Sequence, residues 1–231
     1  MQVIPFAKCV AVCVVAFSAI TSSPSQDNDA LKAKIKLTRE FLINQRAAPA
    51  YRDSIQKSIL AYETGLDIRC KEVVVDFASA DVRDRILALV EVDDKGVAIA
   101  GAWRETLPGT ACNEHRRFTV QVEVAGQGLR FTATFPGEAD GDPELQRDTL
   151  KNIEMDLQIL RFVTKKSCHA EVIDSHLVGE RSTLQDNGLL SQWKESWDVR
   201  SCGKVYAVPI TYIPDKSGTA ISVGVSDIHA E

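Results

Sequence analysis

The sequence predicts an α+β protein made of two tandem copies of one unit, an amphipathic helix followed by a four-stranded antiparallel meander, with one extra N-terminal helix. Three observations predict this fold. A set of landmarks occurs twice, runs of alternating apolar and polar residues are separated by turn residues, and helical stripes of apolar residues precede both copies. With 231 residues, 45% of them hydrophobic and 26% charged, the chain has enough apolar material for a sizeable core.

The repeat is visible in the spacing of tryptophan, cysteine and glycine residues. Trp103 stands nine residues before Cys112, and Trp193 stands nine residues before Cys202. Each of these cysteines is followed sixteen residues later by a glycine, and each copy opens at a further cysteine. The landmarks are Cys70, Trp103, Cys112 and Gly128 in the first copy and Cys168, Trp193, Cys202 and Gly218 in the second. This agreement predicts an internal duplication.

Period-two alternation predicts the strands of both copies. They begin near Cys70, Val97, Phe118 and Gly128, and again near Cys168, Leu189, Val205 and Gly218. The opening cysteine and the tryptophan are 33 residues apart in the first copy and 25 in the second, so the first copy has eight additional residues. We place them around Ala80–Val92, as an extended hairpin arm or a short helix, and favour the arm.

Three helices are expected from stripes of apolar residues at helical spacing. They cover residues 28–46, 49–64 and 143–163. Pro49 falls in the first turn of the second helix, and Asp142 followed by Pro143 is a typical helix start, with a capping side chain before a first-turn proline. The second and third helices belong to the two copies, and the first is an additional element.

The N-terminus is typical of a secretory signal peptide. Lys8 is its only charge, and the apolar run from Cys9 to about Ile20 is shorter than the roughly 20 residues of a transmembrane helix. An uncleaved anchor is the alternative. We expect cleavage near residue 21 and export to the periplasm or the medium, without a later membrane span. The expected division is 1–21 signal peptide, 22–66 N-terminal helices, 67–141 first β repeat and 142–231 second helix with its β repeat.

Four cysteines remain after removal of the signal peptide, and an even number in an exported chain predicts two disulfides. They are Cys70, Cys112, Cys168 and Cys202. We expect Cys70–Cys112 and Cys168–Cys202, because a duplicated unit would keep its own bridge. Copy symmetry alone does not choose among the three possible pairings. No cysteine or histidine spacing of a zinc site is present, so we expect no metal ligand and no cofactor.

The strand alternation places two glutamates on apolar faces. Glu195 shares its face with Trp193, and Glu105 shares its face with Trp103. A buried carboxylate without partners costs several kcal/mol, so we expect each to be at least half buried beside a Lys, an Arg or backbone donors. The same four residues, Trp103, Glu105, Trp193 and Glu195, are the candidate binding residues if these faces line a cleft.

Other candidate chemistry is weak. Glu138, Asp140, Asp142 and Glu144 alternate in a loop that lacks the spacing of a calcium loop, so we expect a solvated connector that ends in a helix cap. His169 and His176 are seven residues apart on a strand and therefore face opposite sides. Hydrolase and phosphate-loop motifs are absent from the sequence, and we assign no catalytic residue. The net charge of −5, with dispersed basic residues, argues against nucleic-acid binding.

The segment from Trp193 to Gly203, with the following Pro-Ile-Thr-Tyr-Ile-Pro-Asp, resembles a pattern at the C-terminus of uncharacterised exported proteins of Gram-negative bacteria. This resemblance covers about 40 residues and implies a periplasmic or secreted setting. It supplies no site residues.

These observations favour an exported, non-catalytic envelope protein that binds another protein, a glycan or a small ligand, either on the solvent-facing sides of the sheets or between the two repeats. Two alternatives stay open. An inhibitor of a periplasmic enzyme would use a protruding loop such as 78–96. A hydrolase of an envelope polymer would need Glu105 and Glu195 to face each other across a cleft, with carboxyl groups about 5–10 Å apart.

Overall fold

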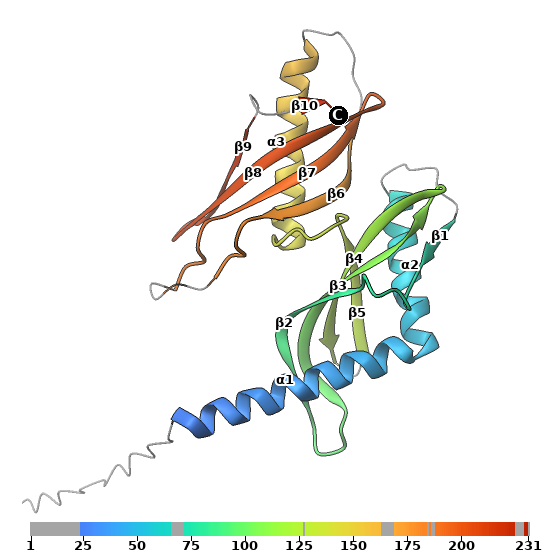
Figure 1. The fold of residues 1–231 in the computed structure, drawn as a ribbon, viewed down its shortest axis with the longest axis vertical. Coiled ribbons are helices and arrows are strands. Elements are labelled where there is room, and N and C mark those ends of the chain that lie inside the picture. The colour runs from blue at the N-terminus through green and yellow to red at the C-terminus, as the bar shows by residue number, and fades with distance from the viewer. Residues whose placement is uncertain are drawn as a thin grey trace, which may run out of the picture.

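A computed structural model shows the fold of the protein (Figure 1). It describes residues 24–65, 72–126, 128–162, 169–183, 185, 188–224 and 229–230. The expected signal peptide at 1–21 lies outside the described residues, as do Cys70 and Cys168.

Three helices and two antiparallel sheets follow one another along the chain. The helices are α1 (Pro24–Ala47), α2 (Pro49–Gly65) and α3 (Pro143–Phe162). The first sheet contains β1 (Val73–Val75), β2 (Arg83–Val92), β3 (Ala98–Ala111), β4 (Glu114–Ala125) and β5 (Gly128–Thr134). The second contains β6 (Ala170–Val178), β7 (Trp193–Ser201), β8 (Lys204–Asp215), β9 (Gly218–Val223) and β10 (His229–Ala230).

The prediction of a four-stranded meander in each copy is wrong, because both sheets have five strands. In the first sheet, β1 and β2 pair with different ends of β3: Val75 lies opposite Gly109, and Arg83 lies opposite Thr106. The intervening residues 76–82 leave the sheet edge and return to it. In the second sheet, β9 and β10 share the outer edge of β8 in the same way. Both sheets therefore have one edge divided between two strands, one of which is very short: β1 in the first sheet and β10 in the second.

The additional residues of the first copy form a strand and not a helix. The expected segment Ala80–Val92 contains β2, which continues through a turn at Asp93–Val97 into β3. The expected strand start near Leu189 is wrong, since β7 begins at Trp193. The preceding residues instead fold on themselves, with Ser191 donating from its amide to the carbonyl of Thr183.

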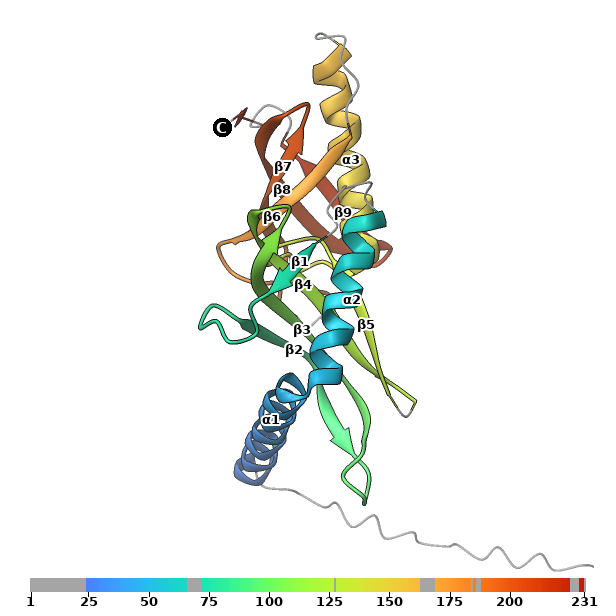
Figure 2. The same cartoon turned by 90° about the vertical axis from the view of Figure 1, so that its right-hand side faces the viewer.

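Each sheet packs against its own helices, as the two views show (Figures 1 and 2). We call α1, α2 and the first sheet the first lobe, and α3 with the second sheet the second lobe. The first core joins Leu42 of α1 and Ile55 of α2 to Trp103 and Val122 of the sheet. The second core joins Ile153 and Leu157 of α3 to Trp197 and Ile210, among others.

Helix side chains also cover the edges of the first sheet. The amide of Val90 in β2 donates to Thr38 Oγ1 of α1 at 3.1 Å, and the amide of Ala133 in β5 donates to Ser58 Oγ of α2 at 3.0 Å. Hydrogen-bonding groups that an edge strand exposes are thereby satisfied, which discourages pairing with another chain.

Two cysteines stand in the tight turns that join β3 to β4 and β7 to β8. Cys112 and Cys202 have φ angles of 53° and 54°, as two-residue hairpin turns require. Both are disulfide-bonded cysteines. Because Cys70 and Cys168 lie outside the described residues, pairing within each copy stays a prediction.

Candidate functional site

Glu105 is completely buried between the first sheet and the helices that cover it. Its Oε1 accepts hydrogen bonds from Tyr51 Oη at 2.8 Å and from Arg46 Nη2 at 3.2 Å. Trp103 Nε1 donates to the same Tyr51 hydroxyl at 3.0 Å. Burial raises the pKa of Glu105, while Arg46 and Tyr51 act in the opposite direction. The carboxylate therefore links the strand to the junction of α1 and α2.

Glu195 is 1% exposed and has a different set of partners. Trp193 Nε1 donates to its Oε1 at 2.9 Å, and Trp197 Nε1 donates to its Oε2 at 2.7 Å. The third donor is the backbone amide of Asp140, which lies 2.7 Å from Oε1. Burial raises the pKa of Glu195, partly offset by these donors. The expectation that both glutamates are at least half buried with partners is confirmed.

The candidate binding residues do not form one site. Trp103 and Trp193 belong to different cores, and Glu105 and Glu195 share no hydrogen-bond partner among the described residues. Neither glutamate lines any of the four main cavities in the described part of the chain. A substrate needs access to both carboxylates in a glycoside hydrolase, so this arrangement gives the hydrolase alternative no support.

The linker between β5 and α3 forms hydrogen bonds with strands of both sheets. The amide of Gly137 donates to the backbone carbonyl of Arg117 in β4 at 3.0 Å, and the amide of Glu138 donates to the backbone carbonyl of Ser175 in β6 at 2.8 Å. Arg104 of β3 donates to the carbonyls of Ala139 and Gly141. The linker is therefore bonded to both sheets.

The expectation of a solvated connector is wrong. Asp140 has a side chain with no solvent exposure, because Arg85 of the first lobe and Arg181 of the second both pair with it. The helix cap is confirmed, since Asp142 Oδ1 accepts the amides of Glu144 and Leu145 at 2.8 and 2.9 Å.

Ion pairs across the junction line a cleft of about 730 Å³. Arg116 of β4 pairs with Glu171 of β6 at 2.7 Å, and Arg200 of β7 pairs with Glu114 of β4 at 2.9 Å. Arg116 also pairs with Glu63 at the end of α2 at 3.3 Å. These pairs join strands of both lobes to a helix of the first lobe and balance the charge of the cleft walls.

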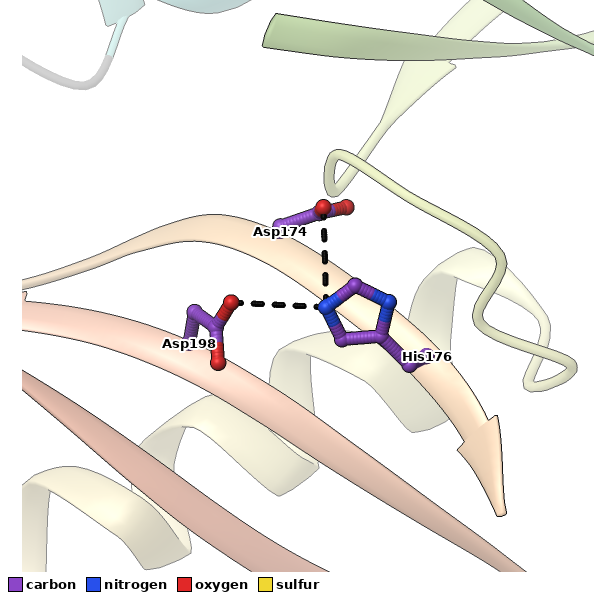
Figure 3. Close-up of side chains that lie close together, drawn as sticks. All are labelled: Asp174, His176 and Asp198. Carbon is purple, nitrogen blue, oxygen red and sulfur yellow. Dashed lines mark hydrogen bonds and ion pairs between the residues drawn. The ribbon is translucent and has the colours of Figure 1, made fainter. Parts of the chain in front are cut away.

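Asp174 and Asp198 line this cleft. His176 lies beside both of them, so that the three side chains form one cluster (Figure 3). Sequence reasoning missed this cluster, although Asp174 and His176 are two apart on one strand. Arg117 Nη2 lies 2.7 Å from Asp174 and 2.9 Å from His176 Nδ1.

Arg117 argues against a metal ion in this cluster. Because a guanidinium only donates, His176 Nδ1 accepts, which leaves the proton of the neutral ring on Nε2. That proton faces Asp198 at 3.3 Å and Asp174 at 3.6 Å. A metal ion at Nε2 would have to displace the proton and compete with Arg117 for Asp174. The cluster is a satisfied hydrogen-bonded network that holds β4 to β6 and β7.

Comparison of the chain with protein-family models, with curated proteins and with solved structures finds no match. In the described part of the chain, no helix is both long enough and apolar enough to span a membrane.

Proposed function

We propose that the protein is an exported, non-catalytic envelope protein that binds another protein through a groove between α1 and β2. The observation that carries this proposal is the groove itself, which has a volume of about 680 Å³. Its apolar lining comes from Leu31, Ile35, Leu42 and Ile43 of α1 and from Ile86, Leu87, Ala88 and Leu89 of β2. Leu31, Ile43 and Leu87 are 48%, 64% and 39% exposed.

The surroundings of the groove support an interaction surface. Twelve large hydrophobic side chains are exposed in the described residues, and six of them lie on α1 or on the hairpin of β2 and β3: Leu31, Leu37, Ile43, Leu87, Val97 and Ile99. Apolar side chains gathered at one end of a molecule are typical of a contact surface for a partner. Figure 2 shows α1 and this hairpin at the same end of the protein.

The charge on α1 indicates the chemistry of the partner. Lys32, Lys34, Lys36 and Arg39 are exposed on this helix. Asp29 and Glu40 offset two of these charges through pairs with Lys32 and Lys36. The net positive charge favours a protein segment with apolar side chains flanked by acidic residues, which would place the former in the groove and the latter beside α1.

A photo-crosslinking residue at Ile43 or Leu87 tests this proposal in the producing cell. We expect both positions to crosslink the same protein. The same photo-crosslinking residue at position 155 of α3, where Met155 is 55% exposed, should not crosslink this protein. Ile43→Glu should abolish the crosslink from position 87, and Ile213→Glu should leave it unchanged. Both variants should melt at the wild-type temperature, because these side chains are exposed. Crosslinks equally strong from Met155, or insensitive to Ile43→Glu, would contradict the proposal.

Export is tested separately. The resemblance of the C-terminal segment and the signal-like first 21 residues support a periplasmic or secreted location. The intact mass of protein recovered from the producing cell should lack about the first 21 residues. A mass that includes Met1 would contradict cleavage.

A second candidate function is inhibition of a periplasmic enzyme by the segment 78–96. The observation in its favour is a braced turn: Asp93 Oδ1 accepts the amides of Lys95 and Val97, both at 2.9 Å. Val97 and Ile99 beside it are 47% and 56% exposed. A rigid apolar tip suits insertion into a cleft. Val97→Asp should abolish inhibition of a target enzyme in this case, while Ile43→Glu should not.

A further inference from the structure

A third, smaller cavity lies where the first sheet, the linker and the residues after β6 meet. It has a volume of about 270 Å³. Its charged lining residues are Arg83, Asp84 and Arg85 of β2, Arg104 of β3, Glu138 of the linker and Arg181 after β6. Four guanidinium groups thus surround a small space to which both lobes contribute.

Arg104 is the most informative residue of this cavity. It is 5% exposed and donates to three neutral oxygens, the carbonyls of Ala139 and Gly141 and Gln121 Oε1. Its Nε has no hydrogen-bond partner among the described residues, and no carboxylate there lies within ion-pair distance of it. Burial and then repulsion from Arg85 lower the pKa of Arg104 to about 10. The carboxylates of Asp140, Glu195 and Asp142 act on this pKa in the opposite direction. A buried cation next to another cation lacks a direct counter-charge.

The carboxylates around the cavity are already engaged. Asp84 pairs with Arg46, which lies outside the cavity lining. Glu138 pairs with Arg117 at 3.4 Å, also outside the lining, and with the lining residue Arg181 at 3.8 Å. Asp140, beneath the cavity, pairs with Arg85 and Arg181. Of the four guanidinium groups, Arg85 and Arg181 pair with Asp140, Arg83 has only Asp81 at 4.0 Å, and Arg104 forms no ion pair among the described residues.

We propose that this cavity binds a small oxyanion, a phosphate or a short carboxylate, between the guanidinium groups of Arg83, Arg104 and Arg181. The class of ligand follows from the lining, because one planar guanidinium group can donate two parallel hydrogen bonds to two oxygens of a phosphate or a carboxylate. The size follows from the volume, which lies below the roughly 300 Å³ of sites for drug-sized ligands. An anion held here contacts both lobes and compensates the buried charge of Arg104.

Isothermal titration of the folded protein with inorganic phosphate, and separately with succinate, tests the proposal. We expect saturable binding of one anion per chain at low ionic strength, weakened by added sodium chloride. The two titrations distinguish a phosphate site from a carboxylate site. Arg83 and Arg181 have side chains that are 60% and 45% exposed, and Asp140 keeps its pair with Arg85 when Arg181 is replaced, so Arg83→Gln with Arg181→Gln should keep the fold. This double variant should bind about tenfold or more weakly.

Arg130→Gln is the matched control, because Arg130 lies on β5, has a side chain that is 66% exposed and does not line the cavity. It should change the dissociation constant less than about twofold. A control that loses as much affinity as the double variant would reduce the effect to net charge and overturn the proposal. So would a double variant that binds like wild type, or the lack of any binding below about 10 mM. Neither Arg83 nor Arg181 lines the α1–β2 groove, so failure here leaves the proposed function intact.

Discussion

Glu105 and Glu195 occupy equivalent positions in the two copies, two residues after a tryptophan, yet the two lobes compensate them differently. In the first lobe the donors are Tyr51 and Arg46, which come from the helices. In the second lobe they are two indoles of the same strand and a backbone amide of the linker. The same buried charge thus anchors a helix pair in one lobe and the interlobe linker in the other.

The difference traces to neighbouring residues. Trp197 in the second copy corresponds to Leu107 in the first, and leucine has no side-chain donor. Tyr212, opposite Trp193, corresponds to Val122, opposite Trp103. Tyr212 stacks on Trp193 with ring centroids 4.6 Å apart, whereas Tyr51 of α2 supplies the phenol next to Trp103. Carboxylates at equivalent positions of the two sheets can thus have different partners, as long as enough donors reach each of them.

The largest effect is expected at the linker, which only the second glutamate holds. A Cβ on Gly137 would lie 2.3 Å from backbone atoms of Ser175, and its φ of 94° is unfavourable for other residues. Gly137→Ala should lower the free energy of unfolding by about 3 kcal/mol or more.

Gly179→Ala is the control for this substitution. Gly179 has a φ of 85°, and a Cβ at this position would have no atom within 4 Å other than those of its chain neighbours. It should cost only about 1 kcal/mol. Chemical denaturation measures both, and equal costs would mean that the contact with β6 contributes nothing beyond backbone strain.

Glu195→Gln is expected to have the next largest effect. All three partners of Glu195 are donors, so the amide NH₂ of a glutamine must face one of them, most directly Trp197 Nε1. One hydrogen bond is lost and buried donors stay unpaired, which should cost about 2 kcal/mol even though a buried charge is removed. Thermal and chemical denaturation check this value. If Glu195→Gln lowers the free energy of unfolding no more than Glu105→Gln does, the two indole donors do not make Glu195 more sensitive to the loss of an acceptor, and the prediction is wrong.

Glu105→Gln should have the smallest effect, below about 1 kcal/mol at neutral pH. Glu105 Oε2 has no hydrogen-bond partner among the described residues, so the glutamine NH₂ can take that place without facing a donor.

The cost of this substitution should also depend on pH. Burial raises the pKa of Glu105. At pH values between the ordinary pKa of about 4.3 and the raised pKa, the folded state binds more protons than the unfolded state. The free energy of unfolding therefore falls as pH rises through this window. Glutamine lacks this titration. The deficit of Glu105→Gln relative to wild type should therefore shrink from about pH 4 to about pH 7 in denaturant titrations. A deficit that grows over this pH range would show that folding lowers the pKa of Glu105 and would contradict the prediction.

Local signals in the sequence predicted the helices well. Pro49 and Pro143 open α2 and α3 at the expected residues, because a first-turn proline and a stripe of apolar residues act within one element. The indole partners of Glu195 could also have been predicted from the sequence, since Trp193 and Trp197 stand two residues before and after it and therefore lie on the same face of the strand.

Contacts between distant residues could not be predicted in this way. The linker reads as a solvated connector because its acidic residues, glycines and prolines are typical of loops. Asp140 is buried only because Arg85 and Arg181, 55 and 41 residues away, converge on it. The division of each sheet edge into two strands likewise depends on where the chain returns to β3 and β8, and local alternation carries no information on that return.

The linker also has a consequence for the order of folding during synthesis. Its partners Arg104 and Arg117 precede it in the chain, whereas Ser175 and Glu195 follow it. A nascent chain that ends before β6 can complete the first core, but its linker is held from one side only. Until the second sheet forms, this segment is exposed to proteases and to mispairing with other nascent chains. Once Ser175 and Glu195 dock, the same peptide groups become inaccessible, so protection of the linker reports completion of the whole protein.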